Sequence, residues 1–187
     1  MRVVLPYEDI INLSPVSPRT SYVFRGNSCF DPDYTGTGHQ PRYFDQYAAV
    51  YQKYKVTASS CKVEMINFSA DSSVIFAVIP NTEILTFTNW QLVSELPLAK
   101  VSEILPVASR YPFNIKDKQT TAKVCGLNQF QVNDEDWSAL TSANPSSVWY
   151  WNICAASMDL GTDVNIQFRV RLEYSVTFYE RIDTPVS

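Results

Sequence analysis

The final long segment of the chain, residues 165–180, alternates without interruption between apolar and polar side chains. The apolar members occupy every second position: Ile166, Phe168, Val170, Leu172, Tyr174, Val176 and Phe178. A repeat of two residues is that of a β-strand, because successive side chains point to opposite faces of a sheet. The segment is therefore predicted to be a long strand with one face in the protein core and the other in water.

A second strand, over residues 55–69, is expected to bend. Its apolar residues form two sets that are offset by one position, Val56 and Ala58 in the first set and Cys61, Val63 and Met65 in the second. One extra residue in a strand produces such an offset. We therefore predict a β-bulge near Ser59-Ser60.

A turn-rich loop and a helical pattern come before that strand. Asp31-Pro32-Asp33, Gly36 and Gly38 break any regular repeat between residues 28 and 41. Apolar and aromatic residues then recur at three- and four-residue steps, at Phe44, Tyr47, Ala48, Tyr51 and Tyr54. This spacing predicts a short amphipathic helix within residues 42–54 whose aromatic face covers an apolar surface.

Eight segments in total have strand character, and three of the connections between them are long. The connection 82–99 is expected to contain a second short helix, because Thr88 and Gln91 have the spacing of a capping box. Many strands with almost no helix predict an all-β, two-sheet antiparallel sandwich. An eight-stranded jelly roll fits best, since its double Greek key needs long crossovers between the sheets. An immunoglobulin-like sandwich, with about seven strands and shorter turns, is the alternative.

Length and composition narrow the class of protein further. A chain of 187 residues can bury one sizeable core, so one domain spanning 1–187 is expected. Only 18% of the residues are charged while 13% are aromatic, a balance that favours a surface partly covered by other protein. No segment has a secretory layout or the roughly 20 apolar residues of a membrane helix. Membrane insertion is therefore not expected.

The four cysteines, Cys29, Cys61, Cys125 and Cys154, are widely spaced and form no CxxC pair. Neither a zinc site nor a disulfide scaffold has this spacing, so we predict buried free thiols in a reducing compartment. His39 is the only histidine, and it lies in the glycine-containing loop, where a structural role is more probable than catalysis. An enzyme of the cupin type would need clustered His and Glu residues, which this chain lacks.

Short motifs in the loop and in the helical pattern carry a family resemblance. They are Cys29-Phe30-Asp31-Pro32-Asp33, Thr35-Gly36-Thr37-Gly38-His39-Gln40-Pro41, Phe44-Asp45-Gln46-Tyr47 and Tyr51-Gln52-Lys53-Tyr54-Lys55-Val56. In these motifs the chain resembles the capsid proteins of circular Rep-encoding single-stranded DNA viruses, which are broadly circovirus-like jelly rolls. The resemblance implies a virion protein whose copies assemble, without cofactor or catalysis, into a small T=1 icosahedral shell around viral single-stranded DNA. Assembly would take place in the nucleus or cytoplasm of the host cell.

The resemblance also implies strands lettered B to I, in two sheets of order BIDG and CHEF, with the anchor helix between C and D. The expected bounds are 7–13 (B), 20–27 (C), 55–69 (D), 73–80 (E), 101–111 (F), 118–126 (G), 147–157 (H) and 163–180 (I). Such capsid proteins usually carry a basic N-terminal arm, whereas this chain opens MRVVLPYEDI and has a net charge of −4. The arm is expected to have been removed from this chain, and its absence by nature is the alternative; either leaves only weak binding to viral DNA. A lectin-like jelly-roll module that binds carbohydrate or another ligand is the alternative function.

Three groups of residues are candidate sites. If D, G and I are neighbours, Lys62, Lys123, Arg169 and Arg171 would form a basic patch on one sheet face that contacts nucleic acid. The alternative is an ordinary polar face on which Glu64 and Glu173 pair with these cations.

Carboxylates in two loops could hold calcium at a subunit contact, namely Asp31 and Asp33 in one loop and Asp134 and Asp136, beside Glu135, in the other. Solvated turn formers are the alternative for these acidic residues. Exposed aromatic residues are candidates for subunit interfaces, above all Trp90 and Trp137 in long loops, and also Tyr34 and Tyr43. Core packing is the alternative for the aromatic residues.

Overall fold

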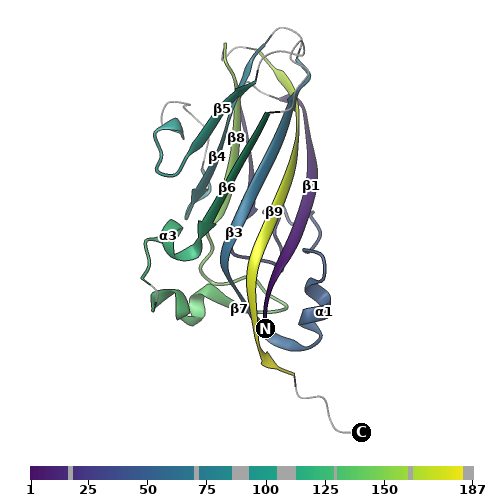
Figure 1. Ribbon diagram of the computed structural model, residues 1–187. Helices are drawn as coiled ribbons and strands as arrows, with labels where there is room; N and C mark the ends of the chain where they lie inside the picture. Colours follow the sequence, from purple (N-terminus) through teal and green to yellow (C-terminus); the bar gives the residue numbers. More distant parts are fainter. Residues whose placement is uncertain are drawn as a thin grey trace.

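A computed structural model describes residues 1–16, 19–69, 72–85, 93–104, 113–128, 130–159 and 162–182 (Figure 1). Its strands form two antiparallel sheets that pack face to face. The first sheet has the order β1-β9-β3-β6, with bounds Arg2–Val16, Val164–Arg181, Tyr51–Asn67 and Phe113–Thr120. The second has the order β2-β8-β4-β5, with bounds Arg19–Arg25, Tyr150–Ser157, Val74–Asn81 and Lys100–Ile104.

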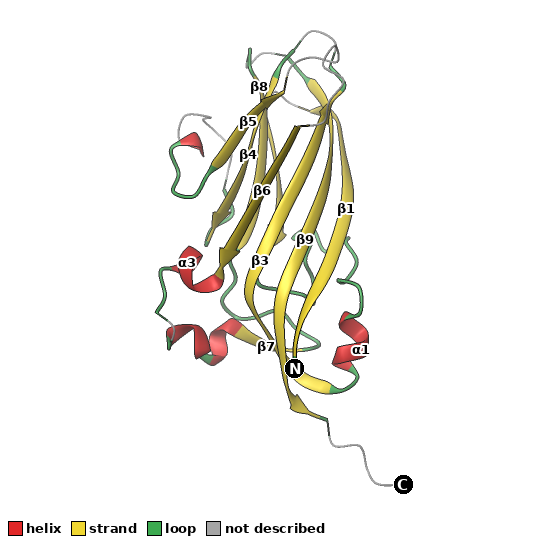
Figure 2. Cartoon of the chain, viewed as in Figure 1, coloured by secondary structure: helices red, strands yellow, loops and turns green. Residues whose placement is uncertain are grey.

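In the jelly-roll lettering, in which β1 is strand B and β9 is strand I, these orders are B-I-D-G and C-H-E-F. The predicted jelly roll is thereby confirmed, and an immunoglobulin-like order is excluded. A ninth strand, β7 (Ser138–Leu140), pairs with β3 inside the connection that the sequence analysis treated as a long loop. The helical elements are short: α1 (Phe44–Ala48), α3 (Thr121–Cys125), η1 (Gln131–Asn133) and η2 (Glu135–Trp137) (Figure 2). No helix among the described residues is long and apolar enough to span a membrane.

The alternating segment forms β9, which lies between β1 and β3 along almost its whole length. Its seven apolar side chains are all buried, as the period of two predicted. They meet the inward residues of β8 and β4 across the sandwich and form one core with them. Tyr174 is fully buried there, and its hydroxyl donates a hydrogen bond to the carbonyl oxygen of Arg25 (2.8 Å).

The bulge is present but lies earlier than predicted. The pairing of β3 with β9 slips between Val56 and Ala58, so Thr57 is the extra residue rather than Ser59 or Ser60. Before the bulge Tyr54 and Val56 point into the core, and after it the odd-numbered residues do so. Ser59 therefore faces inward, where its hydroxyl accepts a hydrogen bond from the indole N–H of Trp151 (2.8 Å).

The anchor helix is confirmed between β2 and β3 but is shorter than predicted. It ends at Ala48, and Tyr51 and Tyr54 belong to β3. Both tyrosines still pack on the same ring as the helix does, with centroids 6.1 and 6.4 Å from that of Phe178. Aromatic residues from a helix and from the following strand thus form one cluster, and their spacing in the sequence was the same as that of one face of a longer helix.

Strand G was misplaced. Residues 113–120 form β6, whereas 121–125 form the helix α3. The Thr120 side chain accepts a hydrogen bond from the Lys123 backbone N–H (3.2 Å), and Gly126 ends the helix at a φ of 65°. These are ordinary helix start and stop signals, because a threonine hydroxyl satisfies a free N–H and glycine adopts positive φ without strain.

Other predicted bounds differ less. The first strand covers Arg2–Val16 rather than 7–13, and β5 covers Lys100–Ile104 where 101–111 was predicted. Residues 105–112 lie outside the described part of the chain. So do Thr88 and Gln91 of the second predicted helix, although residues 93 and 94 are helical.

Candidate nucleic-acid interface

The outward face of the β1-β9-β3-β6 sheet brings together three of the four predicted basic residues. Lys62 of β3 lies opposite Arg171 of β9, and Arg169 lies opposite Glu64 one row further along. Lys123 is not on this face, because it belongs to α3 rather than to a strand. The residue of β6 that lies opposite Lys62 is Lys116, which the sequence analysis missed because its strand G began too late.

Carboxylates are interleaved with these cations. Arg169 forms an ion pair with Glu8 of β1, Lys62 pairs with Glu64, and Arg171 pairs with Glu173 at 3.2 Å. The hydrogen bond from Lys62, together with its charge and that of Arg169, lowers the pKa of the Glu64 carboxyl. The ion pairs of Glu64 and Glu173 with these cations, which the sequence analysis gave as the alternative to a nucleic-acid site, are thus present. All three pairs are largely exposed, where such pairs contribute at most about 1 kcal/mol to stability.

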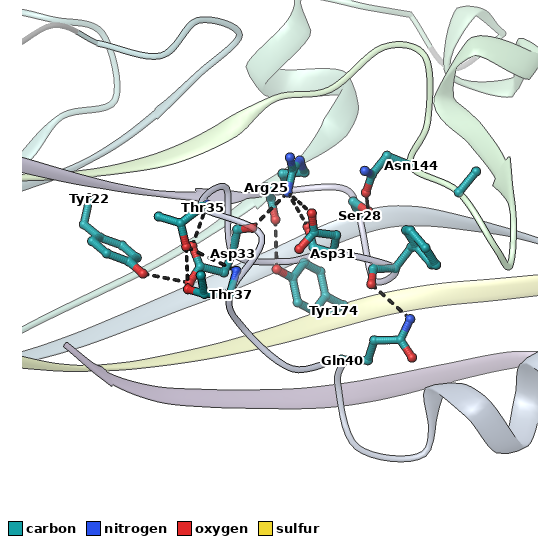
Figure 3. Close-up of polar contacts among 12 residues, drawn as sticks. Tyr22, Arg25, Ser28, Asp31, Asp33, Thr35, Thr37, Gln40, Asn144 and Tyr174 are labelled. Carbon is teal, nitrogen blue, oxygen red and sulfur yellow. Dashed lines mark hydrogen bonds and ion pairs between the residues drawn. The ribbon is translucent and has the colours of Figure 1, made fainter.

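A polar network fixes the loop that follows β2 (Figure 3). The Arg25 guanidinium donates to the Asp31 carboxylate (2.8 Å) and to the carbonyl oxygen of Asp33 (2.9 Å). Asp33 is buried, and it accepts hydrogen bonds from the Tyr22 hydroxyl (2.7 Å) and the Thr35 N–H (2.9 Å). That contact and burial raise the pKa of Tyr22 to about 12, with burial the larger cause.

Asp31 and Asp33 therefore hold their own loop together. Among the described residues no group of three or more His, Cys, Asp or Glu side chains is placed to hold a metal ion within one chain. Asp134 is the residue before the η2 turn and Asp136 lies within it, where its carboxylate accepts a hydrogen bond from the Ser146 hydroxyl (3.1 Å). A calcium ion shared between subunits, as the sequence analysis suggested, stays a prediction.

The aromatic candidates separate into two groups. Tyr34 and Tyr43 are about half exposed, at 46% and 52%, and each stacks under a guanidinium, Arg25 over Tyr34 and Arg42 over Tyr43. Trp137 is partly buried and packs against the core. Trp90 lies outside the described residues. An interface role for these four side chains stays a prediction.

His39 fastens the same loop to β1. Its Nδ1 lies 2.7 Å from the carbonyl oxygen of Gln40 and its Nε2 lies 3.0 Å from that of Glu8. Carbonyl oxygens only accept hydrogen bonds, so both ring nitrogens donate only when the imidazole is protonated. These two contacts raise the pKa of His39 despite the opposing effect of burial, and the Asp9 carboxylate raises it further. Glu8 is neutralised by Arg169, while Arg42 and Arg171 line the neighbouring hollow.

This arrangement predicts a pH dependence of stability. A folded-state pKa above the unfolded value of about 6.5 gives stabilisation that is complete below that value and is lost as pH rises through the folded pKa. Replacing His39 by glutamine should therefore lower the melting temperature more at pH 5.5 than at pH 8.5. Melting curves of both proteins at several pH values test this expectation. A constant difference between the two proteins across this range would contradict it.

The cysteines are free thiols, as predicted, although Cys125 is only partly buried. Burial raises the pKa of every one of them, to about 11 for Cys125 and about 12 for Cys154. At neutral pH they are therefore uncharged and poor nucleophiles.

Comparison with known proteins finds similarity in structure only. No protein-family model matches the chain, and a search of curated proteins also found no match. A 60-mer of the BFDV capsid protein is 14% identical over 100% of this chain and 97% of that chain, with a TM-score of 0.44. Turnip yellow mosaic virus is 8% identical over 100% and 97%, with a TM-score of 0.47. Tobacco necrosis virus is 12% identical over 98% of each chain, with a TM-score of 0.43. The assignment of a jelly roll rests on the strand order of the chain itself.

Proposed function

We propose that this chain is the shell domain of a viral capsid protein, whose copies assemble into a small T=1 icosahedral particle around single-stranded DNA. One observation carries the proposal. The loop and helix whose motifs resemble capsid proteins of circular Rep-encoding single-stranded DNA viruses occupy the C–D connection of a B-I-D-G and C-H-E-F jelly roll, the place that the resemblance requires. A fold alone does not imply a function, so the agreement between motif and position is what supports it.

The interior of the C–D connection supports a structural role for these motifs. Phe44 is buried against Tyr54, with ring centroids 5.3 Å apart and planes at 87°. The Ser28 hydroxyl donates to Asn144 (2.6 Å), and the Gln40 amide donates to the carbonyl oxygen of Phe30 (3.0 Å). The motif residues thus build a rigid end of the sandwich on which Tyr34 is displayed to a neighbouring copy. In this proposal the protein catalyses no reaction.

Electron microscopy of the purified protein tests the proposal directly. We expect uniform spherical particles in negative stain across a range of salt and pH, because symmetric contacts repeated by every copy close a shell. The ratio of absorbance at 260 and 280 nm on the same sample reports whether nucleic acid is enclosed. Monomers or small oligomers under all conditions would contradict the proposal and favour the lectin-like alternative, for which binding to a glycan array is the next measurement.

A further inference from the structure

Positive charge is concentrated on one side of the molecule. Among the described residues, eight Lys and Arg side chains point outward from the β1-β9-β3-β6 sheet: Arg2, Lys53, Lys55, Lys62, Lys116, Lys118, Arg169 and Arg171. Six carboxylates lie among or beside them: Glu8, Glu64, Asp134, Glu135, Glu173 and Glu180. This face therefore carries an excess of two positive charges in a chain of net charge −4, which leaves −6 for the remainder. Such an asymmetry directs polyanions to one face even when the whole protein is acidic.

Three hollows on this face meet at Arg171. The first, also lined by Lys62 and Glu64, lies over β9 and β3. The second extends to Lys116 on β6 and has a volume of about 310 Å³. The third reaches the loop beside β1, where His39 and Arg42 line a volume of about 520 Å³. Together they form one trough that crosses the strands from the C–D loop to β6, here called the Arg171 trough.

The cations in the trough are only partly neutralised. Lys62 and Lys116 lie directly opposite each other in the β3–β6 register, and like charges in that position destabilise a sheet. Among the described residues the Lys116 ammonium has no ion-pair partner, whereas Lys62 has Glu64. Ser60, Arg171 and Glu173 line the same hollow, and Glu173 pairs with Arg171 at 3.2 Å, so Lys116 is the cation there that lacks an ion-pair partner among the described residues. An anion with several oxygens would relieve the repulsion and accept hydrogen bonds from the ammonium, guanidinium and hydroxyl groups.

The Tyr43 ring lies beside the end of the trough at the C–D loop, next to Arg42, but does not itself line any of the three hollows. Arg42 lines the trough and lies over the Tyr43 ring, with its guanidinium carbon 5.1 Å from the centroid. Tyr43 has a φ of 73°, an uncommon conformation for a bulky residue, and its ring stays half exposed. Strained backbone of this kind is found at functional sites. An exposed ring beside a cation can stack a base, which a sulfated polysaccharide does not have.

We propose that the Arg171 trough binds single-stranded nucleic acid, with a phosphate held between Lys62, Lys116 and Arg171 and a base stacked on Tyr43. This inference rests on the proposed function, because a capsid protein must present one face to its genome. The other contacts are to the phosphate backbone, so binding should not depend on the base sequence. The trough differs from the basic patch predicted from sequence in using Lys116 and Tyr43 and in excluding Lys123.

The test uses the whole chain and a fluorescent 20-nucleotide oligo(dT), with anisotropy measured at several salt concentrations. Lys116→Glu should weaken binding by about tenfold or more and reduce the salt dependence, since each phosphate contact to a single strand contributes about 0.7 to the slope of log K against log salt. Lys123→Glu is the matched control, because it makes the same charge change on α3, and it should alter the affinity less than twofold. Equal losses in the two variants, or no binding by the natural sequence at low salt, would overturn the inference.

A second pair of measurements identifies the polyanion. Tyr43→Ala should weaken binding of oligo(dT) about tenfold, as base stacking contributes about 1–3 kcal/mol per base, but leave heparin binding unchanged. Heparin binding that responds to Lys116→Glu, while oligo(dT) binding does not, would show that the trough serves a polysaccharide instead. Electron microscopy of the same samples separates the two proposals. Oligo(dT) binding with the expected variant pattern but without particles would contradict only the capsid function, and particles without that pattern would contradict only the trough.

Discussion

Replacing Phe178 by alanine should lower the free energy of unfolding by about 3–5 kcal/mol, the usual cost of removing a fully buried aromatic ring. Phe178 is 0% exposed, and its ring contacts both the anchor helix and the start of β3. Its ring stacks on Tyr47 with centroids 5.0 Å apart, and the centroid of Phe44 lies 5.9 Å away. The lost ring therefore removes the surface against which α1 packs.

Urea denaturation of the natural sequence and of the variant measures this effect. Tyr179→Ala is the control, because Tyr179 is the next residue of β9 but faces outward, where we expect a change within about 0.5 kcal/mol. Limited proteolysis should also cut the Phe178→Ala variant within residues 42–50 well before global unfolding. A loss below about 1 kcal/mol would contradict the view that Phe178 anchors the helix.

The architecture could be predicted from the sequence because its main signal, the two-residue repeat of apolar side chains, does not depend on knowing the tertiary contacts. Seven consecutive repeats of two residues fix the long strand β9, and a central strand of that length determines much of the sheet around it. The buried run of β4 and the aromatic run of β8 are similarly direct. The strand order followed from the jelly-roll hypothesis rather than from any single residue.

The position of β6 could not be read in the same way, because two of the three buried residues on its inward face are polar. Asp117 and Gln119 are buried at positions where alternation would place apolar residues. Asp117 is held by Lys100 of β5 in the opposite sheet (2.9 Å), and the Gln119 amide donates to Asp117 (2.6 Å). These two polar residues interrupt the alternation of apolar side chains that marks a strand. Their partners could be identified only from the fold, so the sequence did not show that they are buried.

Only part of the candidate site could be predicted, because its other residues also depend on contacts that are distant in the sequence. Lys62, Arg169 and Arg171 could be placed on one face from the sheet order alone. The neutralisation of Arg169 by Glu8, 161 residues away, depends on the register of β1 with β9. Lys116 became visible only when the bounds of β6 were known. Residue type and strand order therefore predicted a charged face, and the register decided which charges remain available.

Replacing Gly26 by alanine should destabilise the protein by about 3 kcal/mol or more, at the upper end of the cost of overpacking a core. A Cβ atom at this position would lie 2.3 Å from two carbons of the Trp149 ring, well inside the contact distance of real atoms. The ring cannot move aside cheaply. It is completely buried, its N–H donates to the Thr121 hydroxyl (3.1 Å), and its centroid lies 5.2 Å from that of Trp151 in an edge-to-face contact.

Gly36→Ala is the matched control for this substitution. Gly36 has a φ of 73°, but nothing lies within 4 Å of an added Cβ, so only the backbone cost of about 1–2 kcal/mol applies. The double variant Gly26→Ala/Trp149→Phe gives the sharper test, because the smaller ring removes the carbons that the new Cβ would strike. Its loss of stability in chemical denaturation should be clearly smaller than the sum of the two single losses. Two results would contradict this expectation: strict additivity of the two losses, or equal effects of the two glycine substitutions. Either would show that the Trp149 ring can move aside at little cost and that its close approach to Gly26 does not constrain this end of the sandwich.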